Sequence, residues 1–224
     1  MLTYIDFSEY DTEHISNYWE EVWAGGAEWS IVTSNDYSGG KALRKYAQSS
    51  GRRFLAYTPV GDKVKNCEFL LRGIANSAGE HHLVIVRAGG KEGSENGYRF
   101  SVITRSNETV LRISKYTNGT LTILGEKTLN ESLVNTWFFI KGKVEGEQLK
   151  GKIWKVGERE PEEWGIEVVD TSFKYGKLGL GFYASGSGIF DVFSFFVTDD
   201  VIPPPTLWVK VNGVYKPSVG VRPL

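Results

Sequence analysis

The sequence contains few of the residues that build disulfides, metal clusters or membrane helices. Its 224 residues include one cysteine, one methionine and three histidines. The lone Cys67 excludes an intrachain disulfide framework and any multi-cysteine zinc site. No apolar run approaches the roughly 18 residues of a membrane helix, and the first residues lack the basic and apolar regions of a secretion signal. We therefore expect no membrane partner.

Charge of either sign is not in excess. The chain has 26 Lys+Arg against 27 Asp+Glu, which gives a formal charge of −1. Proteins held mainly by nucleic-acid phosphates or anionic lipids carry a basic excess, so no nucleic-acid partner is expected. Many Lys and Glu residues together with little Met and Cys are typical of heat-adapted proteins and predict a thermophilic source.

Glycine and aromatic residues are abundant, with 26 glycines and 13% aromatics. This composition favours short strands joined by tight turns. Period-2 alternation recurs from residue 28 to 197 and predicts about thirteen strands. The predicted strands are Glu28–Thr33, Ala42–Ala47, Arg53–Thr58, Asn66–Ile74, His82–Ala88, Gly97–Thr104, Thr109–Tyr116, Thr120–Lys127, Thr136–Val144, Gln148–Val156, Gly165–Asp170, Lys177–Tyr183 and Ile189–Thr198. They form two stacked antiparallel sheets, because one open sheet that wide would curl or split.

Local signals refine this picture. Asn118-Gly119 and Gly146 predict two tight hairpin turns. Gly179 and Gly181 lie within a strand pattern, where glycine indicates close packing against a neighbouring backbone. Apolar residues at helical spacing predict one short helix within Thr12–Trp23.

The C-terminal residues differ in composition from the rest. Three prolines within residues 201–206 favour an extended segment, so we expect a folded domain over 1–200 and a proline-rich linker and tail over 201–224. Leu207–Pro217 alternate around Asn212-Gly213 and predict a hairpin too small to fold alone. Its apolar side chains are expected to anchor the chain to another subunit or to a particle. The anchoring residues are Leu207, Trp208, Val209, Val211, Val214 and Tyr215.

Three segments in the second half carry a succession of tryptophans and glycines: Asn135–Gly146, Leu149–Trp164 and Gly176–Tyr183. They resemble the concanavalin A-like, or laminin G-like, jelly-roll modules, and the likeness covers about residues 4–198. The resemblance implies an all-β, two-sheet antiparallel jelly-roll sandwich. That superfamily includes lectins, polysaccharide-binding modules, glycosidases and viral attachment domains, so the fold alone assigns no function. Separately, Trp208–Pro217 resembles short tail segments of phage structural proteins.

The resemblance also implies sites. Exposed aromatic side chains would contact a glycan, with Trp154, Trp164 and Tyr98 as candidates; the alternative is that they are core residues, since most Trp side chains are largely buried. Such modules often hold a structural calcium where the first and last strands meet, which makes Asp6 and Asp191 the candidate ligands. The alternative here is two surface carboxylates at strand ends. No other cofactor is expected.

The sequence shows no catalytic constellation. Glycoside hydrolysis needs two carboxylates across the scissile bond. The nearest string, Glu9, Asp11 and Glu13, lies at the start of the predicted helix, where acidic residues cap backbone amides. His81 and His82 are adjacent and would point to opposite faces of a strand. We therefore predict no catalytic residue and no enzymatic activity.

Taken with the resemblance, the sequence predicts a non-enzymatic virion structural or attachment protein. Its jelly roll would be displayed on a phage capsid or tail, touch surface glycans and form a homo-oligomer, while the tail binds other virion proteins. The first alternative is a secreted, extracellular polysaccharide-binding module, which the aromatic content supports. A glycoside hydrolase is the weaker alternative, because the carboxylate motif is missing.

Overall fold

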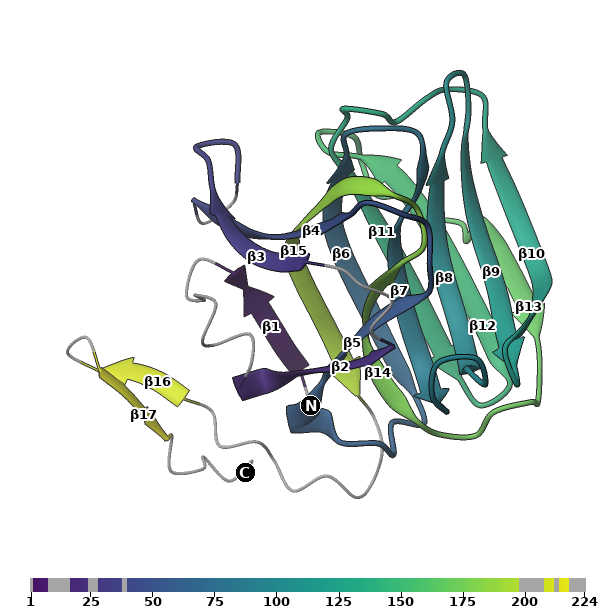
Figure 1. Cartoon of the computed structure of the whole chain (residues 1–224), viewed down its shortest axis with the longest axis horizontal. Helices are drawn as coiled ribbons and strands as arrows, with labels where there is room; N and C mark the ends of the chain where they lie inside the picture. The colour runs from purple at the N-terminus through teal and green to yellow at the C-terminus, as the bar shows by residue number, and fades with distance from the viewer. Residues whose placement is uncertain are drawn as a thin grey trace.

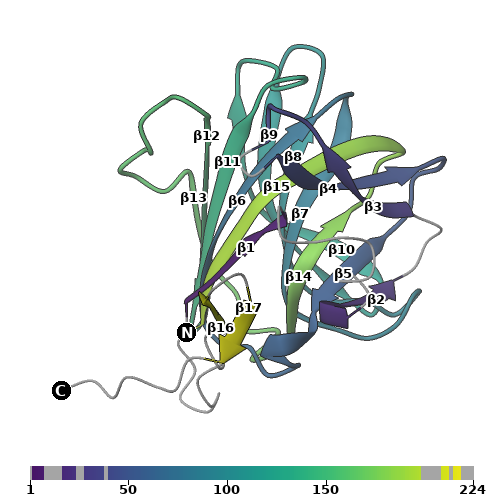
Figure 2. The ribbon, with the colours of Figure 1, turned by 90° about the vertical axis from the view of Figure 1, so that its left-hand side faces the viewer.

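The computed structural model describes residues 2–7, 17–23, 28–37, 40–197, 208–211 and 214–217, and the regular structure of these residues is almost entirely strand. Two antiparallel sheets stack on each other (Figure 1), and a side view separates β6, β11 and β12 of one sheet from β5, β10 and β14 of the other (Figure 2). The predicted jelly-roll sandwich is therefore confirmed. Within the described ranges, no helix is long and apolar enough to cross a membrane.

The larger sheet has eight strands, in the order β13-β12-β11-β6-β15-β4-β3, with β1 also paired to β15. Its strands are β1 (Leu2–Asp6), β3 (Glu28–Thr33), β4 (Lys41–Ala47), β6 (Cys67–Ala75), β11 (Phe138–Glu145), β12 (Gln148–Lys155), β13 (Ile166–Val169) and β15 (Gly186–Val197). A bulge at Asp191 divides the long strand β15, which pairs with β4 before the bulge and with β1 after it.

The second sheet has seven strands, in the order β10-β9-β8-β7-β14-β5-β2. Its strands are β2 (Trp19–Trp23), β5 (Arg53–Tyr57), β7 (Gly79–Gly89), β8 (Asn96–Thr104), β9 (Thr109–Thr117), β10 (Thr120–Leu129) and β14 (Lys177–Phe182). A short 3-10 helix, η2 (Thr58–Val60), follows β5. All thirteen predicted strands are present, with ends shifted by a few residues at most.

The main core lies between the two sheets, because alternate residues of each strand point inward. On β6, Phe69 and Leu71 are buried while their neighbours are partly exposed, and Phe100 of β8 meets Phe69 edge to face at 5.0 Å between ring centres. Cys67 is part of this core. Burial of these side chains stabilises the fold at about 25 cal/mol per Å² of apolar area.

The predicted turns and close-packed glycines are confirmed. Asn118 and Gly119 both have positive φ, 48° and 77°, as a two-residue hairpin turn between β9 and β10 requires. A Cβ atom added to Gly179 would lie 2.1 Å from the carbonyl oxygen of Leu55, so only glycine fits there. Gly181 is similarly close to the backbone of Arg53.

The predicted helix over Thr12–Trp23 is wrong for its last five residues, which form strand β2. Asn17 and Tyr18 are helical, and residues 12–16 lie outside the described part of the chain. A register shift between Glu21 and Trp23 explains the misleading spacing. An extra residue in a strand sends the following side chain to the opposite face. Trp19 therefore packs in the main core, whereas Trp23 packs on the outer face of the sheet.

In the tail, β16 (Trp208–Val211) and β17 (Val214–Pro217) pair antiparallel, with Val211 opposite Val214, as the hairpin prediction requires. Leu207 lies outside the described residues, and so do the anchoring contacts predicted for the tail side chains.

Candidate functional site

The outer face of the seven-stranded sheet carries a second cluster of buried apolar side chains. On β7, Val84 and Val86 point into the main core, while Leu83 and Ile85 point outward and are still only 2% and 1% exposed. Trp23 and Phe54 join them, with 5.1 Å between their ring centres. The outer face of a sheet is usually exposed to solvent. Buried apolar side chains on this face are therefore unusual.

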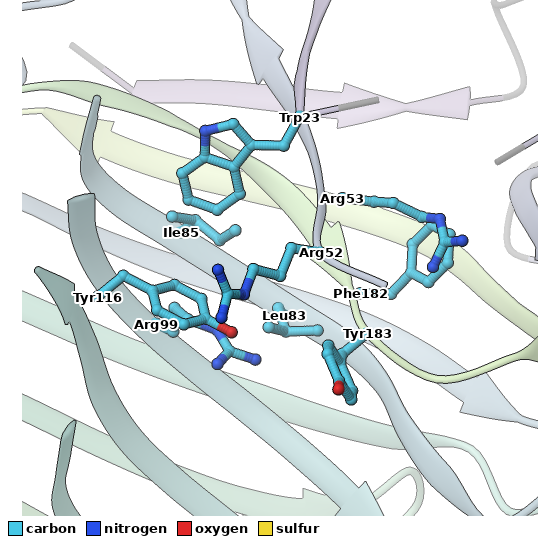
Figure 3. Close-up of a pocket in the computed structure, with 9 residues that line it drawn as sticks. All are labelled: Trp23, Arg52, Arg53, Leu83, Ile85, Arg99, Tyr116, Phe182 and Tyr183. Atoms are coloured by element: carbon cyan, nitrogen blue, oxygen red, sulfur yellow. The ribbon is translucent and has the colours of Figure 1, made fainter. Parts of the chain in front are cut away.

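This cluster forms the floor of a narrow, shallow hollow (Figure 3), whose lining side chains leave no space between them for a water molecule. The residues around it are unusual in kind, because arginine alternates with aromatic rings. The lining arginines are Arg52, Arg53 and Arg99; the lining aromatic residues are Trp23, Tyr116, Phe182 and Tyr183. They come from β2, β5, β8, β9 and β14 and from residues flanking β5 and β14.

Tyr116 is the centre of one half of the hollow. The guanidinium carbons of Arg52 and Arg99 lie 4.5 and 4.7 Å from the centre of its ring (Figure 3), within the range of cation–π attraction. Arg52 also donates a hydrogen bond of 2.8 Å to the buried carboxylate of Glu95, which accepts a second bond from the Gly93 amide. Burial opposes the charge of Arg52, but Tyr116 and Glu95 together raise its pKa.

Phe182 is the centre of the other half. The Lys45 ammonium lies 3.7 Å and the Arg53 guanidinium 5.0 Å from its ring centre. Lys45 is fully buried and donates to the carbonyl oxygens of Ala184 and Gly186. Burial, with a smaller contribution from Arg53, lowers the pKa of Lys45 to about 7.

Three buried polar groups on this face have no hydrogen-bond partner among the described residues: the Trp23 indole N–H and the hydroxyls of Ser101 and Ser114. Ser114 lies directly opposite Arg99 across the β8–β9 pair. Buried donors are normally bonded, but the surrounding side chains cover these three groups completely, so a ligand at the surface of the hollow does not reach them.

The residues predicted to bind sugar do not meet in this hollow. Tyr98 is fully buried in the main core, where its hydroxyl donates to Asp170 Oδ1 at 2.8 Å and burial raises its pKa to about 12. A side chain with no exposed surface cannot stack on a sugar ring, so Tyr98 has a structural role here.

Trp154 lies on β12 of the other sheet, and Trp164 lies in the segment between β12 and β13. Trp154 stacks on Phe139 with 5.3 Å between ring centres and is only 7% exposed. Trp164 covers the ammonium of Lys152, which is 4.9 Å from its ring centre. Lysine–glutamate pairs surround both rings, as between Lys141 and Glu160. Sugar binding by these two residues stays a prediction.

The two predicted calcium ligands are neighbours across a strand pair, since Asp6 is opposite Val192, the residue after Asp191. Asp191 is fully buried at the bulge and forms an ion pair with Arg72. The guanidinium already balances the charge of this carboxylate, so Asp191 fits a calcium site poorly. No cluster of three or more His, Cys, Asp or Glu side chains occurs within the described ranges. The calcium site stays a prediction.

A second groove, of about 230 Å³, lies near one end of β2, β5 and β14. Its acidic residues are Glu20 and Asp62, and Glu20 forms an ion pair with Lys177. A general acid needs a raised pKa and a nucleophile needs a free carboxylate. The Glu20 carboxylate is already engaged by Lys177, so it is not the free carboxylate that a glycosidase nucleophile requires.

Sequence reasoning missed the hollow, although one signal pointed to it. The run of Arg52 and Arg53 follows a Ser50-Gly51 turn, and Arg99 alternates with the core residues Tyr98 and Phe100. An arginine at an outward position of a central strand indicates a functional face, because exposure to solvent does not by itself require an arginine at that position.

No model of a known protein family matches the chain, and no curated protein matches its sequence. Solved structures do match. The carbohydrate-binding module CBM66 from Bacillus subtilis has a TM-score of 0.55 at 17% identity, over 77% of this chain and 91% of that one. A legume lectin-like domain from Entamoeba histolytica has a TM-score of 0.57 at 11% identity, over 87% and 97%.

The exoplasmic domain of VIP36, in a form bound to calcium and mannose, has a TM-score of 0.54 at 13% identity, over 92% and 91% of the two chains. At such low identities these likenesses show the fold alone. The chain therefore has the jelly-roll fold of lectins and carbohydrate-binding modules, and its ligand must be argued from its own side chains.

Proposed function

We propose that the protein is a non-enzymatic carbohydrate-binding module, and that its ligand binds in the arginine–aromatic hollow of the seven-stranded sheet. The observation that carries the proposal is the alternation of guanidinium groups and aromatic rings around a buried apolar floor. Sugar rings have apolar faces that pack on aromatic side chains, and their hydroxyls accept hydrogen bonds from arginine. The similar structures support this use, since their names describe a carbohydrate-binding module and lectin domains.

Tyr183 provides the sharpest test. It lines the hollow and is 42% exposed, so its ring is available to a ligand. We expect Tyr183→Ala to weaken glycan binding by about tenfold, which corresponds to about 1.4 kcal/mol. Binding is measured on a glycan array and then by calorimetry with the best glycan.

Tyr175→Ala is the matched control, because Tyr175 is 61% exposed and does not line the hollow. Both variants should keep the melting temperature, since neither side chain is buried. Equal binding by the two variants and the unchanged protein would move the site elsewhere. The predicted residues Trp154 and Trp164 would then be the next to test.

The finer prediction, a virion protein, is a separate proposal. It is supported by the resemblance of Trp208–Pro217 to phage tail segments, and none of the similar structures described above is a virion protein. The lectin and binding-module likenesses favour glycan binding without favouring a virion over an extracellular setting. Truncation of the tail, described in the Discussion, is its test.

A further inference from the structure

The three arginines of the hollow differ in how much of each a ligand could reach. Arg53 and Arg99 are only 1% and 2% exposed, whereas the side chain of Arg52 is 33% exposed. Arg53 donates to the carbonyl oxygens of Ser49 and Gly51, which hold it in place. Arg52 is therefore the guanidinium that a bound molecule would touch.

Arg52 is also pre-organised. Its bond to Glu95 and its packing on Tyr116 fix the plane of the guanidinium (Figure 3). A guanidinium has five N–H donors, and the bonds to Glu95 and Tyr116 use only part of this set. Because Glu95 is 1% exposed and tied to Gly93, it stays in place when a ligand arrives.

The surroundings of Arg52 carry charges of both signs. Arg53 and Arg99 lie in the same hollow, and Lys45 lies against Phe182 at its edge. The carboxylates that face them are Glu95 on Arg52 and, through space, Glu21 and Glu92 on Arg53. Three guanidinium groups therefore face three carboxylates, and Lys45, with its pKa of about 7, carries only part of a charge at neutral pH, so the fit to an anion rests on the remaining N–H donors of Arg52.

Size narrows the ligand further. Ordinary small-molecule sites measure about 300–1,000 Å³, whereas the side chains that line this hollow leave no space within it for even a water molecule. A ligand can therefore meet only the exposed groups at the surface of the hollow, which are Arg52 and Tyr183. Arginine binds planar carboxylates through two parallel hydrogen bonds, which a neutral hydroxyl cannot match.

We propose that the hollow recognises an acidic sugar, a uronic acid unit whose carboxylate binds Arg52 while its ring packs on Tyr183. This inference rests on the proposed function and names its ligand class. The buried Arg53 and Arg99 lie beside the bound unit without touching it.

The test compares polymers that differ in charge. Polygalacturonate is compared with its methyl-esterified form, which has the same sugar without the negative charge, and with a sulfated galactan, which has a different anion. Binding is measured by affinity electrophoresis and calorimetry with the full chain. We expect binding to polygalacturonate, much weaker binding to the ester and the sulfated polymer, and a loss of affinity with rising salt.

Three variants assign the contact. Arg52→Gln should lower the affinity for polygalacturonate by about 10–100-fold, as expected for a lost hydrogen bond to a charged group. Arg52→Lys keeps the charge beside Glu95 and the fold but loses the planar fork, so it should also weaken binding. Arg159→Gln is the control, because Arg159 is 85% exposed and does not line the hollow.

The outcomes separate the two proposals. Tighter binding to the methyl ester, or binding unaffected by both Arg52 variants, overturns the acidic-sugar inference and leaves glycan binding intact. Tighter binding to the sulfated polymer overturns the carboxylate assignment. If Tyr183→Ala and the Arg52 variants change no glycan affinity at all while the protein still binds a glycan, the hollow itself is not the site and the proposed function fails with it.

Discussion

Lys45 makes the stability of the domain depend on pH in a way that one substitution can isolate. It is a fully buried lysine on β4, packed against Phe182, and burial lowers its pKa from 10.5 to about 7. The unfolded chain therefore binds this proton between about pH 7 and 10.5 while the folded chain does not. Unfolding takes up a proton in this window, so the free energy of unfolding rises with pH.

The magnitude follows from the two pKa values. Each pKa unit of difference corresponds to about 1.36 kcal/mol, so the full difference is worth about 5 kcal/mol. The upper part of this pH range, above about pH 9.5, is not practical for unfolding experiments. Between pH 7 and 9.5 we expect the free energy of unfolding to rise by about 2–3 kcal/mol. Burial also raises the pKa values of Tyr57 and Tyr98 to about 12, which lowers stability only above about pH 10. Those tyrosines therefore leave the window unaffected.

Denaturant unfolding at half-unit steps from pH 6 to 9.5 measures this slope. Lys45→Met keeps the length of the side chain and removes the charge, so it should flatten the slope. It leaves the carbonyl oxygens of Ala184 and Gly186 without this donor, at a cost of about 1 kcal/mol that does not vary with pH. Lys63→Met is the control, because Lys63 is exposed. Parallel slopes for the unchanged protein and Lys45→Met would refute the reasoning.

Three further predictions concern the metal, the tail and the sheet. Chelation should leave the melting temperature unchanged, because Arg72 already balances Asp191; a drop that calcium restores would instead establish the predicted calcium site. Removal of residues 203–224 should leave the jelly roll folded and abolish incorporation into particles or higher oligomers; unfolding would place the tail in the core, and normal incorporation would disprove the anchor. Gly179→Ala should cost more than about 3 kcal/mol or prevent folding, whereas Gly89→Ala, which meets nothing within 4 Å, should be tolerated; equal melting temperatures would contradict the close approach.

Much of the fold could be predicted from local signals. The period-2 alternation of side chains predicted every strand from β3 to β15, because one side of each strand faces the main core and the other side does not. The failure at β2 has a definite cause. Trp19 and Trp23 are four residues apart, a spacing that suits both a helix and one face of a strand, and the bulge that separates their faces depends on pairing with β5. Pairing of that kind involves residues far along the chain and is not visible locally.

The candidate site was less predictable for a related reason. Arg52, Arg99 and Tyr116 are far apart in the sequence and meet only because β5, β8 and β9 belong to one sheet. The family resemblance directed attention to Trp154 instead, whose ring stacks on Phe139 on the other sheet. Tryptophan is the most conspicuous residue in a sequence, but its exposure is decided by cross-strand neighbours.

The alternation of faces along β7 and β8 has a consequence for redesigning this sheet. On β8, Tyr98 and Phe100 fill the main core while Arg99 and Ser101 face the other way, so neighbouring codons specify the main core and the opposite face separately. A library that varies only the outward positions would sample new ligands with the inner packing held constant. Polar changes at Ser101 should be accepted more readily than changes at Arg99, because the guanidinium also supports the ring of Tyr116.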